Sequence, residues 1–249
     1  MRAGRFADTV CLVTGGGRGI GRGVALALAA EGASVGVCAR TLAQCEAVAA
    51  EIGSARGIAV ATDVTDLGSC EAAVAAVTER FGPPAVVVSA AGISPVRQRA
   101  EVHDVDAWRA ILEVNLTGAY LTARAAAPAL LEHGGALVLI SSTTGTRASP
   151  RIAGYGASKA GLTHLARTLA REWGGRGVRV NAVSPGYVET ELTARLLAVD
   201  RLRDEILRDT PLGRIATVAD IVPAVLFLAS DEAAYVTGTE LLVDGGMAA

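Results

Sequence analysis

Short apolar runs recur along the chain and are separated by stretches with helical periodicity. The runs fall at Val10–Thr14, Ser34–Ala39, Ile58–Ala61, Ala85–Ser89, Ala136–Ser141, Arg179–Val183 and Glu240–Val243. The Ala- and Leu-rich stretches between them begin near Gly19, Leu42, Leu67, Trp108, Tyr155 and Val218. A strand buried on both faces reads as a continuous apolar run, and helical crossovers force such strands to be parallel. The pattern predicts an α/β, doubly wound Rossmann-type fold with about seven parallel strands flanked by helices on both faces.

The composition favours a folded chain with a large core. Of the 249 residues, 51% are hydrophobic and 19% are charged, which excludes general disorder. The net charge of −2 gives no basic face for nucleic acid. No apolar segment approaches the roughly 18 residues of a membrane span. No linker, charge block or repeat divides the sequence. We therefore expect one domain over residues 1–249, with neither nucleic acid nor a membrane as a partner.

The cysteines indicate a reduced environment. Cys11, Cys38, Cys45 and Cys70 have no CxxC or Cys/His spacing, so no metal site is expected. Cys11 and Cys38 fall within apolar runs, where cysteine behaves as a small buried hydrophobe. The apolar run Val10–Val13 is too brief for a secretory signal. These features predict a cytoplasmic protein.

A glycine-rich loop joins the first expected strand to the first expected helix. It reads TGGGRGIG over Thr14–Gly21. Glycine permits positive φ, and its small size lets backbone N–H groups approach a pyrophosphate at a helix N-terminus. The spacing is TGxxxGxG rather than the general GxGxxG, and a plain tight turn is the alternative. The residues expected to line the pyrophosphate are Gly15, Gly17, Arg18, Gly19, Ile20 and Gly21.

The end of the second expected strand indicates which cofactor is used. Folds that bind NAD usually place an acidic residue there, about 20 residues past the glycine loop, to bind the ribose 2′-hydroxyl. Here the strand ends in Ala39-Arg40, and Arg18 lies in the loop nearby. Arginine binds phosphate oxygens in a bidentate fork. The pair therefore favours NADP(H), although two solvated surface arginines are the alternative.

A tyrosine and a lysine provide the first chemical signal. Tyr155 and Lys159 are spaced i and i+4, which places them on one face of a helix. A free phenol has a pKa of about 10, and a nearby ammonium favours the phenolate. YxxxK alone is often structural, so its neighbours decide whether the pair is functional.

Three other features point to the same end of the sheet. Ser142 follows an apolar strand, where its hydroxyl can bind a substrate oxygen, whereas alternation turns Ser141 the other way. Asn115 lies within a helical stretch, where an asparagine is unfavourable unless its amide has a partner. The segment Asn181–Gly186 forms a turn after the sixth strand. Ligands of open α/β sheets bind at this carboxyl end.

In these features the chain resembles the short-chain dehydrogenase/reductase family, of the compact single-domain type, from about Phe6 to Met247. The resemblance is carried by the TGxxxGxG loop and, in order, by Asp63, Val64, Asn115, Ser142, Tyr155, Lys159, Pro185, Gly186 and the closing Val243–Gly246. It implies a catalytic tetrad in which Tyr155 is the acid/base, Ser142 holds the substrate oxygen, Lys159 binds the ribose and tunes Tyr155, and Asn115 supports a water in a proton relay. It implies further cofactor contacts at Asp63, Val64, Ala91, Gly92, Pro185, Gly186, Val188 and Thr190, in addition to those of the tetrad residues.

One motif departs from the family pattern. The family usually has Asn-Asn-Ala-Gly after the fourth strand, whereas this chain has Ser89-Ala90-Ala91-Gly92. We expect the missing amides to weaken hydrogen bonds that brace the central strands, while Gly92 keeps the backbone open for the cofactor ribose.

The resemblance implies an NADPH-dependent reductase that converts a ketone or aldehyde to an alcohol, reversibly, with hydride from nicotinamide C4 and a proton from Tyr155. The alternatives are a 3-oxoacyl-carrier-protein reductase, a non-catalytic NADP(H)-binding protein, and an epimerase or dehydratase. Relatives also imply a homotetramer, with a dimer as the alternative, built on the helices that begin near Trp108 and Tyr155. The Ala-rich runs Ala119–Leu131 and Ala157–Leu169 suit such contacts but suit packing within a domain equally well.

Two surface segments bear on the substrate. The stretch from Tyr187 to Asp209 is expected to form a substrate lid, either as an amphipathic helix pair or as an arginine-lined grip for an anion. The β-ketoacyl-carrier-protein reductases, which the chain resembles, dock an acidic carrier protein and commonly present basic residues before the fifth and sixth strands. Glu132 and His133 occupy the first place, and only Arg176 and Arg179 occupy the second. A free small molecule is therefore favoured over a carrier-bound chain.

Overall fold

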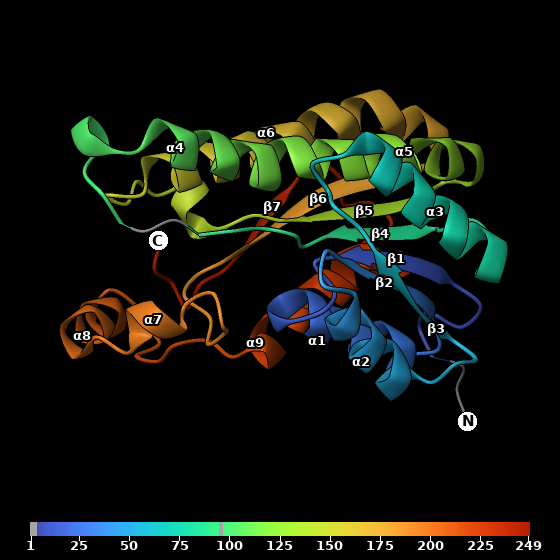
Figure 1. Ribbon diagram of the computed structural model, residues 1–249, viewed down its shortest axis with the longest axis horizontal. Coiled ribbons are helices and arrows are strands. Elements are labelled where there is room, and N and C mark those ends of the chain that lie inside the picture. Colours follow the sequence, from blue (N-terminus) through green and yellow to red (C-terminus); the bar gives the residue numbers. More distant parts are fainter. Residues whose placement is uncertain (1–3, 95–96) are drawn as a thin grey trace.

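A computed structural model describes residues 4–94 and 97–249. Its centre is a seven-stranded parallel sheet with the order β3-β2-β1-β4-β5-β6-β7 (Figure 1). The strands are β1 (Val10–Thr14), β2 (Ser34–Ala39), β3 (Gly57–Ala61), β4 (Val86–Ser89), β5 (Gly135–Ile140), β6 (Val178–Pro185) and β7 (Glu240–Val243). The α/β, doubly wound fold expected from the sequence is confirmed.

Helices cover both faces of the sheet (Figure 1). On one face lie α1 (Gly19–Ala30), α2 (Leu42–Ile52) and α9 (Val218–Ala229). On the other lie α3 (Leu67–Phe81), α4 (Val105–Leu112), α5 (Gly118–His133) and α6 (Ala153–Trp173). Short helices α7 (Ala194–Leu197) and α8 (Asp200–Arg208) extend from one end of the sheet. Single turns of 3-10 helix lie at Ala100–Val102, Thr143–Gly145, Gly174–Arg176 and Asp231–Ala233.

The strand residues divide between two apolar cores. Val13, Val37 and Val88 belong to the core beneath α1 and α9. Leu12, Val87 and Leu137 belong to the core beneath α3, α5 and α6. Successive side chains of a strand point to opposite faces, so a sheet covered on both sides needs apolar residues at nearly every position. This requirement explains why the strands read as unbroken apolar runs.

The chain reverses its direction of progress across the sheet between β3 and β4. β1 pairs with β2 on one side and with β4 on the other, and Thr14 at its carboxyl end is opposite both Cys38 and Ser89. The connections on the two sides therefore leave in opposite directions, and a crevice opens between them. This crevice lies at the end of β1, where the glycine loop begins.

The expected helix near Trp108 proved to be two helices. α4 begins at Val105 because the Asp104 side chain caps it, accepting a hydrogen bond from the Asp106 N–H at 2.9 Å. A π-helical turn over Glu113–Thr117 then separates α4 from α5. The helix expected at Tyr155 begins two residues earlier, at Ala153. The expected strands differ from those observed mainly at their ends. β6 is the longest of them and runs on to Pro185, so the turn expected over Asn181–Gly186 is wrong for all but Gly186, because Asn181–Pro185 continue the strand.

Among the described residues, no helix combines the length and the apolar character of a membrane span.

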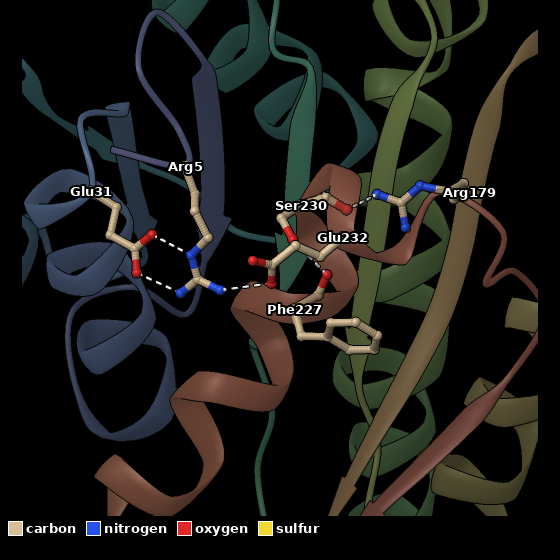
Figure 2. Close-up of polar contacts among 6 residues, drawn as sticks. All are labelled: Arg5, Glu31, Arg179, Phe227, Ser230 and Glu232. Atoms are coloured by element: carbon tan, nitrogen blue, oxygen red, sulfur yellow. Dashed lines mark hydrogen bonds and ion pairs between the residues drawn. The ribbon is translucent and has the colours of Figure 1, made fainter. Parts of the chain in front are cut away.

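Two arginines join separate elements of the molecule through hydrogen bonds (Figure 2). Arg179 on β6 donates from Nη1 to the Leu228 carbonyl at 2.7 Å and from Nη2 to the Ser230 carbonyl at 2.9 Å. These carbonyls lie at the end of α9, where helical partners run out. Arg5 binds the Glu31 carboxylate with two nitrogens and donates to Glu232 at 3.1 Å.

We predict that Arg179→Met destabilises the protein by about 1–3 kcal/mol, because two carbonyls of α9 lose charged donors in a half-buried site. Urea unfolding followed by circular dichroism measures the change. Arg176→Met is the matched control, since Arg176 is exposed and lies just before the same strand. An equal loss of stability in both variants would contradict the capping role.

Candidate active site

A cleft of about 280 Å³ opens at the carboxyl ends of the central strands. Every residue proposed from the sequence to bind the cofactor lines this cleft, except Asn115. The glycine loop, the end of β2, the turn after β4 and the turn after β6 each contribute part of the wall. Residues far apart in the sequence are thus brought together where the fold places its crevice.

The glycine loop is too closely packed for side chains. Gly15 has a φ of +67°, and a Cβ there would lie 2.6 Å from the Ala91 nitrogen. A Cβ on Gly21 would lie 2.2 Å from the Gly15 carbonyl oxygen. The next helix, α1, starts at Gly19, and no side chain caps its N-terminus. Its first N–H groups and its dipole therefore suit a phosphate group.

Arg18 and Arg40 lie exposed where the glycine loop and the end of β2 line this cleft, beside Thr41 and Gln44. Neither arginine forms an ion pair with a carboxylate among residues 4–94 and 97–249. Asp63, which also lines the cleft, accepts hydrogen bonds from the N–H and the hydroxyl of Thr65 at 3.0 and 2.8 Å. These bonds, with a contribution from the charge of Arg40, lower the pKa of Asp63. Two guanidinium groups without a described carboxylate partner and one carboxylate thus lie at this end of the cleft.

Tyr155 and Lys159 lie one turn apart near the start of α6. The Lys159 ammonium lies 5.6 Å from the centre of the Tyr155 ring. Its Nζ donates to the Ile140 carbonyl oxygen at 2.8 Å, and the side chain is buried. The two side chains therefore share the helix face that their spacing predicts, with the ammonium beside the phenol.

Burial acts on both groups in the direction that keeps them neutral. It raises the pKa of Tyr155 to about 12, while the neighbouring Ser142 hydroxyl acts in the opposite direction. Burial lowers the pKa of Lys159 to about 8. Before a cofactor binds, Tyr155 is thus a protonated phenol at neutral pH, and Lys159 loses its proton far more readily than an exposed lysine.

The two serines after β5 point in different directions. The Ser141 hydroxyl donates to the Lys159 carbonyl oxygen at 2.9 Å, inside α6. The Ser142 hydroxyl accepts a hydrogen bond from the Thr144 hydroxyl at 3.0 Å and lines the cleft beside Tyr155. This is the arrangement that strand alternation predicts.

Asn115 is buried in the π-helical turn and binds backbone rather than the cleft. Its Oδ1 accepts from the Ile93 N–H at 2.8 Å, and its Nδ2 donates to the Ile93 carbonyl at 3.0 Å. The Nδ2 also donates to the Ser158 hydroxyl at 3.3 Å, and Ser158 donates to the Tyr155 carbonyl at 2.7 Å. The amide thus connects the loop residue that follows Gly92 to the helix that carries Tyr155.

The sequence did not reveal the contacts of Asn115, because Ile93 and Ser158 are ordinary residue types in ordinary positions. It also identified no cause for the π-helical turn that turns Asn115 inward.

One buried hydroxyl lies beside the altered Ser89–Gly92 motif. Thr14 Oγ1 is buried and has no hydrogen-bond partner among the described residues. Thr14 is opposite Ser89, the first residue of the altered motif. The unpaired hydroxyl lies at the place where the missing amides are expected to weaken the bracing of the central strands.

A second cavity of about 400 Å³ adjoins the cleft on the side of the lid. Ser142 and Tyr155 line both spaces. The lid segment contributes Tyr187, Leu192, Thr193, Arg195, Leu196 and Leu202. Ser94, Thr144 and Ile152, which the sequence did not single out, complete part of the wall. No group of metal-ligating side chains occurs in the described part of the chain.

Comparison with known proteins gives matches over nearly the whole chain. A family model described as enoyl-(acyl carrier protein) reductase matches residues 15–248. Galactitol 2-dehydrogenase (L-tagatose-forming) of Cereibacter sphaeroides is 42% identical, covering 96% of this chain and 95% of that protein. The 3-oxoacyl-[acyl-carrier-protein] reductase FabG of Escherichia coli (strain K12) is 39% identical over 97% and 98%. A solved short-chain type dehydrogenase/reductase from Mycobacterium ulcerans has a TM-score of 0.92 and 36% identity, covering 98% and 90%.

Lys159 is the only lysine among the 249 residues, which makes its titration directly observable. We predict that the single NMR resonance of protein labelled with [13Cε]lysine titrates with a midpoint near 8, well below the ordinary 10.5. Because the unfolded chain then holds more protons between pH 8 and 10, unfolding free energy should rise with pH in that window.

Lys159→Met is the control for this titration, since it removes both the resonance and this contribution to the pH dependence. A midpoint above 10 in the unliganded protein would contradict the burial described here.

Proposed function

The chain belongs to the short-chain dehydrogenase/reductase family, and we propose that it is an NADPH-dependent reductase, reversible in principle, of a ketone or aldehyde. The observation that carries the proposal is that Ser142 and Tyr155 line both the cleft beside the glycine loop and the adjoining cavity. A substrate oxygen bound between these hydroxyls has its carbonyl carbon at the boundary of the two spaces. When bound, the cofactor supplies hydride to that carbon.

The residues of the chain supply the proton, bind the substrate oxygen and hold the cofactor. Tyr155, protonated at neutral pH, donates its proton to the developing alkoxide. The Ser142 hydroxyl donates a hydrogen bond to the same oxygen. The Lys159 ammonium, 5.6 Å from the phenol ring, stabilises the tyrosinate that remains. The glycine loop, Arg18 and Arg40 hold the phosphates, and Asn115 positions the backbone at Ile93.

The second candidate is a 3-oxoacyl-carrier-protein reductase, as in the FabG relative. The structure disfavours one part of the docking surface this would need. Both guanidinium ends of Arg179 are already bound at the end of α9, so Arg176 is left as the exposed arginine before β6. Before β5, Glu132 lies 4.0 Å from His133 and adds negative charge. A free small molecule therefore remains the favoured substrate.

We also propose a homotetramer, on the strength of the family relationship. Several alanines of α5 and α6, including Ala123, Ala126 and Ala166, are buried in the core of the chain itself. The alanine runs therefore serve internal packing first. Tyr120, 44% exposed on α5, remains free for a contact between subunits.

Replacing Tyr155 tests the mechanism. Tyr155→Phe keeps the ring but removes the proton donor, so turnover of any active ketone should fall by about 10²-fold or more while cofactor affinity is kept. Steady-state kinetics and fluorescence titration with NADPH measure the two properties. Tyr120→Phe is the matched control and should leave both unchanged. A Tyr155→Phe enzyme with half of the original turnover would show that another group supplies the proton, or that the protein only binds the cofactor.

Cofactor preference tests the role of the two arginines. We predict that kcat/KM for NADPH exceeds that for NADH by at least about tenfold. Arg40→Asp should lower or reverse the ratio, because the carboxylate repels a 2′-phosphate and accepts from a 2′-hydroxyl. Arg56→Asp, an exposed substitution outside the cleft, is the control. The assignment fails if NADH serves equally well, or if Arg40→Asp leaves the ratio unchanged.

A further inference from the structure

The charges around the second cavity are all of one sign. Its lining includes two arginines, Arg97 and Arg195, and contains no aspartate or glutamate among the described residues. A cavity that served neutral sugars or ketones would have no need of two guanidinium groups. Their presence is a feature that reduction of a carbonyl does not itself require.

Neither guanidinium is neutralised by the part of the protein that the structure describes. Arg195 lies on α7 and forms no ion pair with a described carboxylate. Arg97 donates to the Pro150 carbonyl at 3.2 Å, which is a neutral partner. Two other arginines nearby are paired, Arg201 at 3.7 Å from Glu205 and Arg147 at 3.0 Å from Asp209, whereas Arg203 on α8 forms no ion pair with a described carboxylate but lies outside the cavity lining. The two arginines that line the cavity are thus left with uncompensated charge.

The rest of the cavity is largely apolar. Ile152, Leu192, Leu196 and Leu202 line it, together with the ring of Tyr187. Apolar walls exclude water once a ligand is bound, and attraction between charges is stronger there than in open solvent. A volume of about 400 Å³ suits a small ring or a short chain.

We propose that the substrate is an oxo acid, with an apolar ring or short chain between its carbonyl and a carboxylate that Arg195 and Arg97 bind. The inference rests on the proposed function, because Ser142 and Tyr155 are taken to hold the carbonyl end. In the reduction, the carbonyl carbon gains hydride from NADPH and the oxygen gains the proton of Tyr155. The products are the hydroxy acid and NADP⁺, and the carboxylate keeps its charge throughout.

The carboxylate matches the arginines in shape as well as charge. A guanidinium presents parallel N–H groups that fit the two oxygens of a carboxylate. The competing interpretation is that both arginines are ordinary solvated surface residues that bind no ligand, since Arg195 is exposed. The two interpretations predict different effects of esterifying the carboxylate: kcat/KM falls if the arginines bind it, and does not fall if they only contact solvent.

The test compares each acid with its own methyl ester. Levulinate and 4-oxocyclohexanecarboxylate are assayed against their esters with NADPH, in the wild type and in Arg195→Gln and Arg97→Gln. We expect kcat/KM for at least one acid to exceed that of its ester by about tenfold or more, the scale of a charged hydrogen bond. Each Gln variant should move the acid-to-ester ratio toward one. Arg203→Gln, on α8 and outside the cavity lining, should leave the ratio unchanged.

A binding measurement keeps this inference separate from the catalytic proposal. Calorimetry with Tyr155→Phe protein and NADP⁺ measures the affinity of the corresponding hydroxy acids and hydroxy esters without turnover. Preference for the acids that weakens with added salt and in Arg195→Gln supports the inference, even if the rate of reduction is low. Equal or tighter binding of the esters, or a ratio that neither Gln variant changes, overturns it. Reduction of neutral ketones with no such preference would leave the reductase in place and remove only the anion site.

Discussion

Helices cover both faces of the sheet, and this constraint determines where chemistry can occur. Strands buried on both sides must be apolar along their length, so polar groups can emerge only where the strands end. The reversal of strand order between β1 and β4 opens one crevice at those ends. The glycine loop fills the base of that crevice, and a Cβ on Gly15 would lie 2.6 Å from the backbone nitrogen of Ala91, just past β4. The cleft, the Tyr155–Lys159 pair and the cavity beside them all depend on this arrangement.

At this end of the sheet the fold buries the Lys159 amine, although burying its charged form costs free energy. Lys159 is buried, and the described structure gives its ammonium one hydrogen bond, to the Ile140 carbonyl. Desolvation of this kind destabilises the folded chain when the amine is protonated. Asn115 and Ser158 stabilise the surrounding backbone instead, because each binds the main chain beside the site. Such a site is held in place by its neighbours rather than by its own interactions.

The sequence predicted the fold because each buried strand is an unbroken apolar run and each crossover has helical periodicity. It also predicted the positions of Tyr155, Lys159 and Ser142, because helical and strand spacing fix which face each side chain occupies. It did not predict the break between α4 and α5, since a π-helical turn leaves no marked signal in residues 113–117. Nor could it decide how the lid arginines are used. Whether an arginine is paired depends on carboxylates distant in sequence, as Arg147 with Asp209 illustrates.

The single, buried lysine has a consequence for the outer surface. With every other basic side chain of the sequence an arginine or a histidine, the exterior presents no ε-amino group. Aldehydes and reactive ketones condense with exposed lysine amines to form imines, whereas guanidinium groups, which stay protonated, are poor nucleophiles under the same conditions. A protein that handles carbonyl compounds and lacks surface lysines offers these compounds no exterior lysine amine with which to condense. The same property means that amine-directed dyes and coupling resins have no surface lysine to react with.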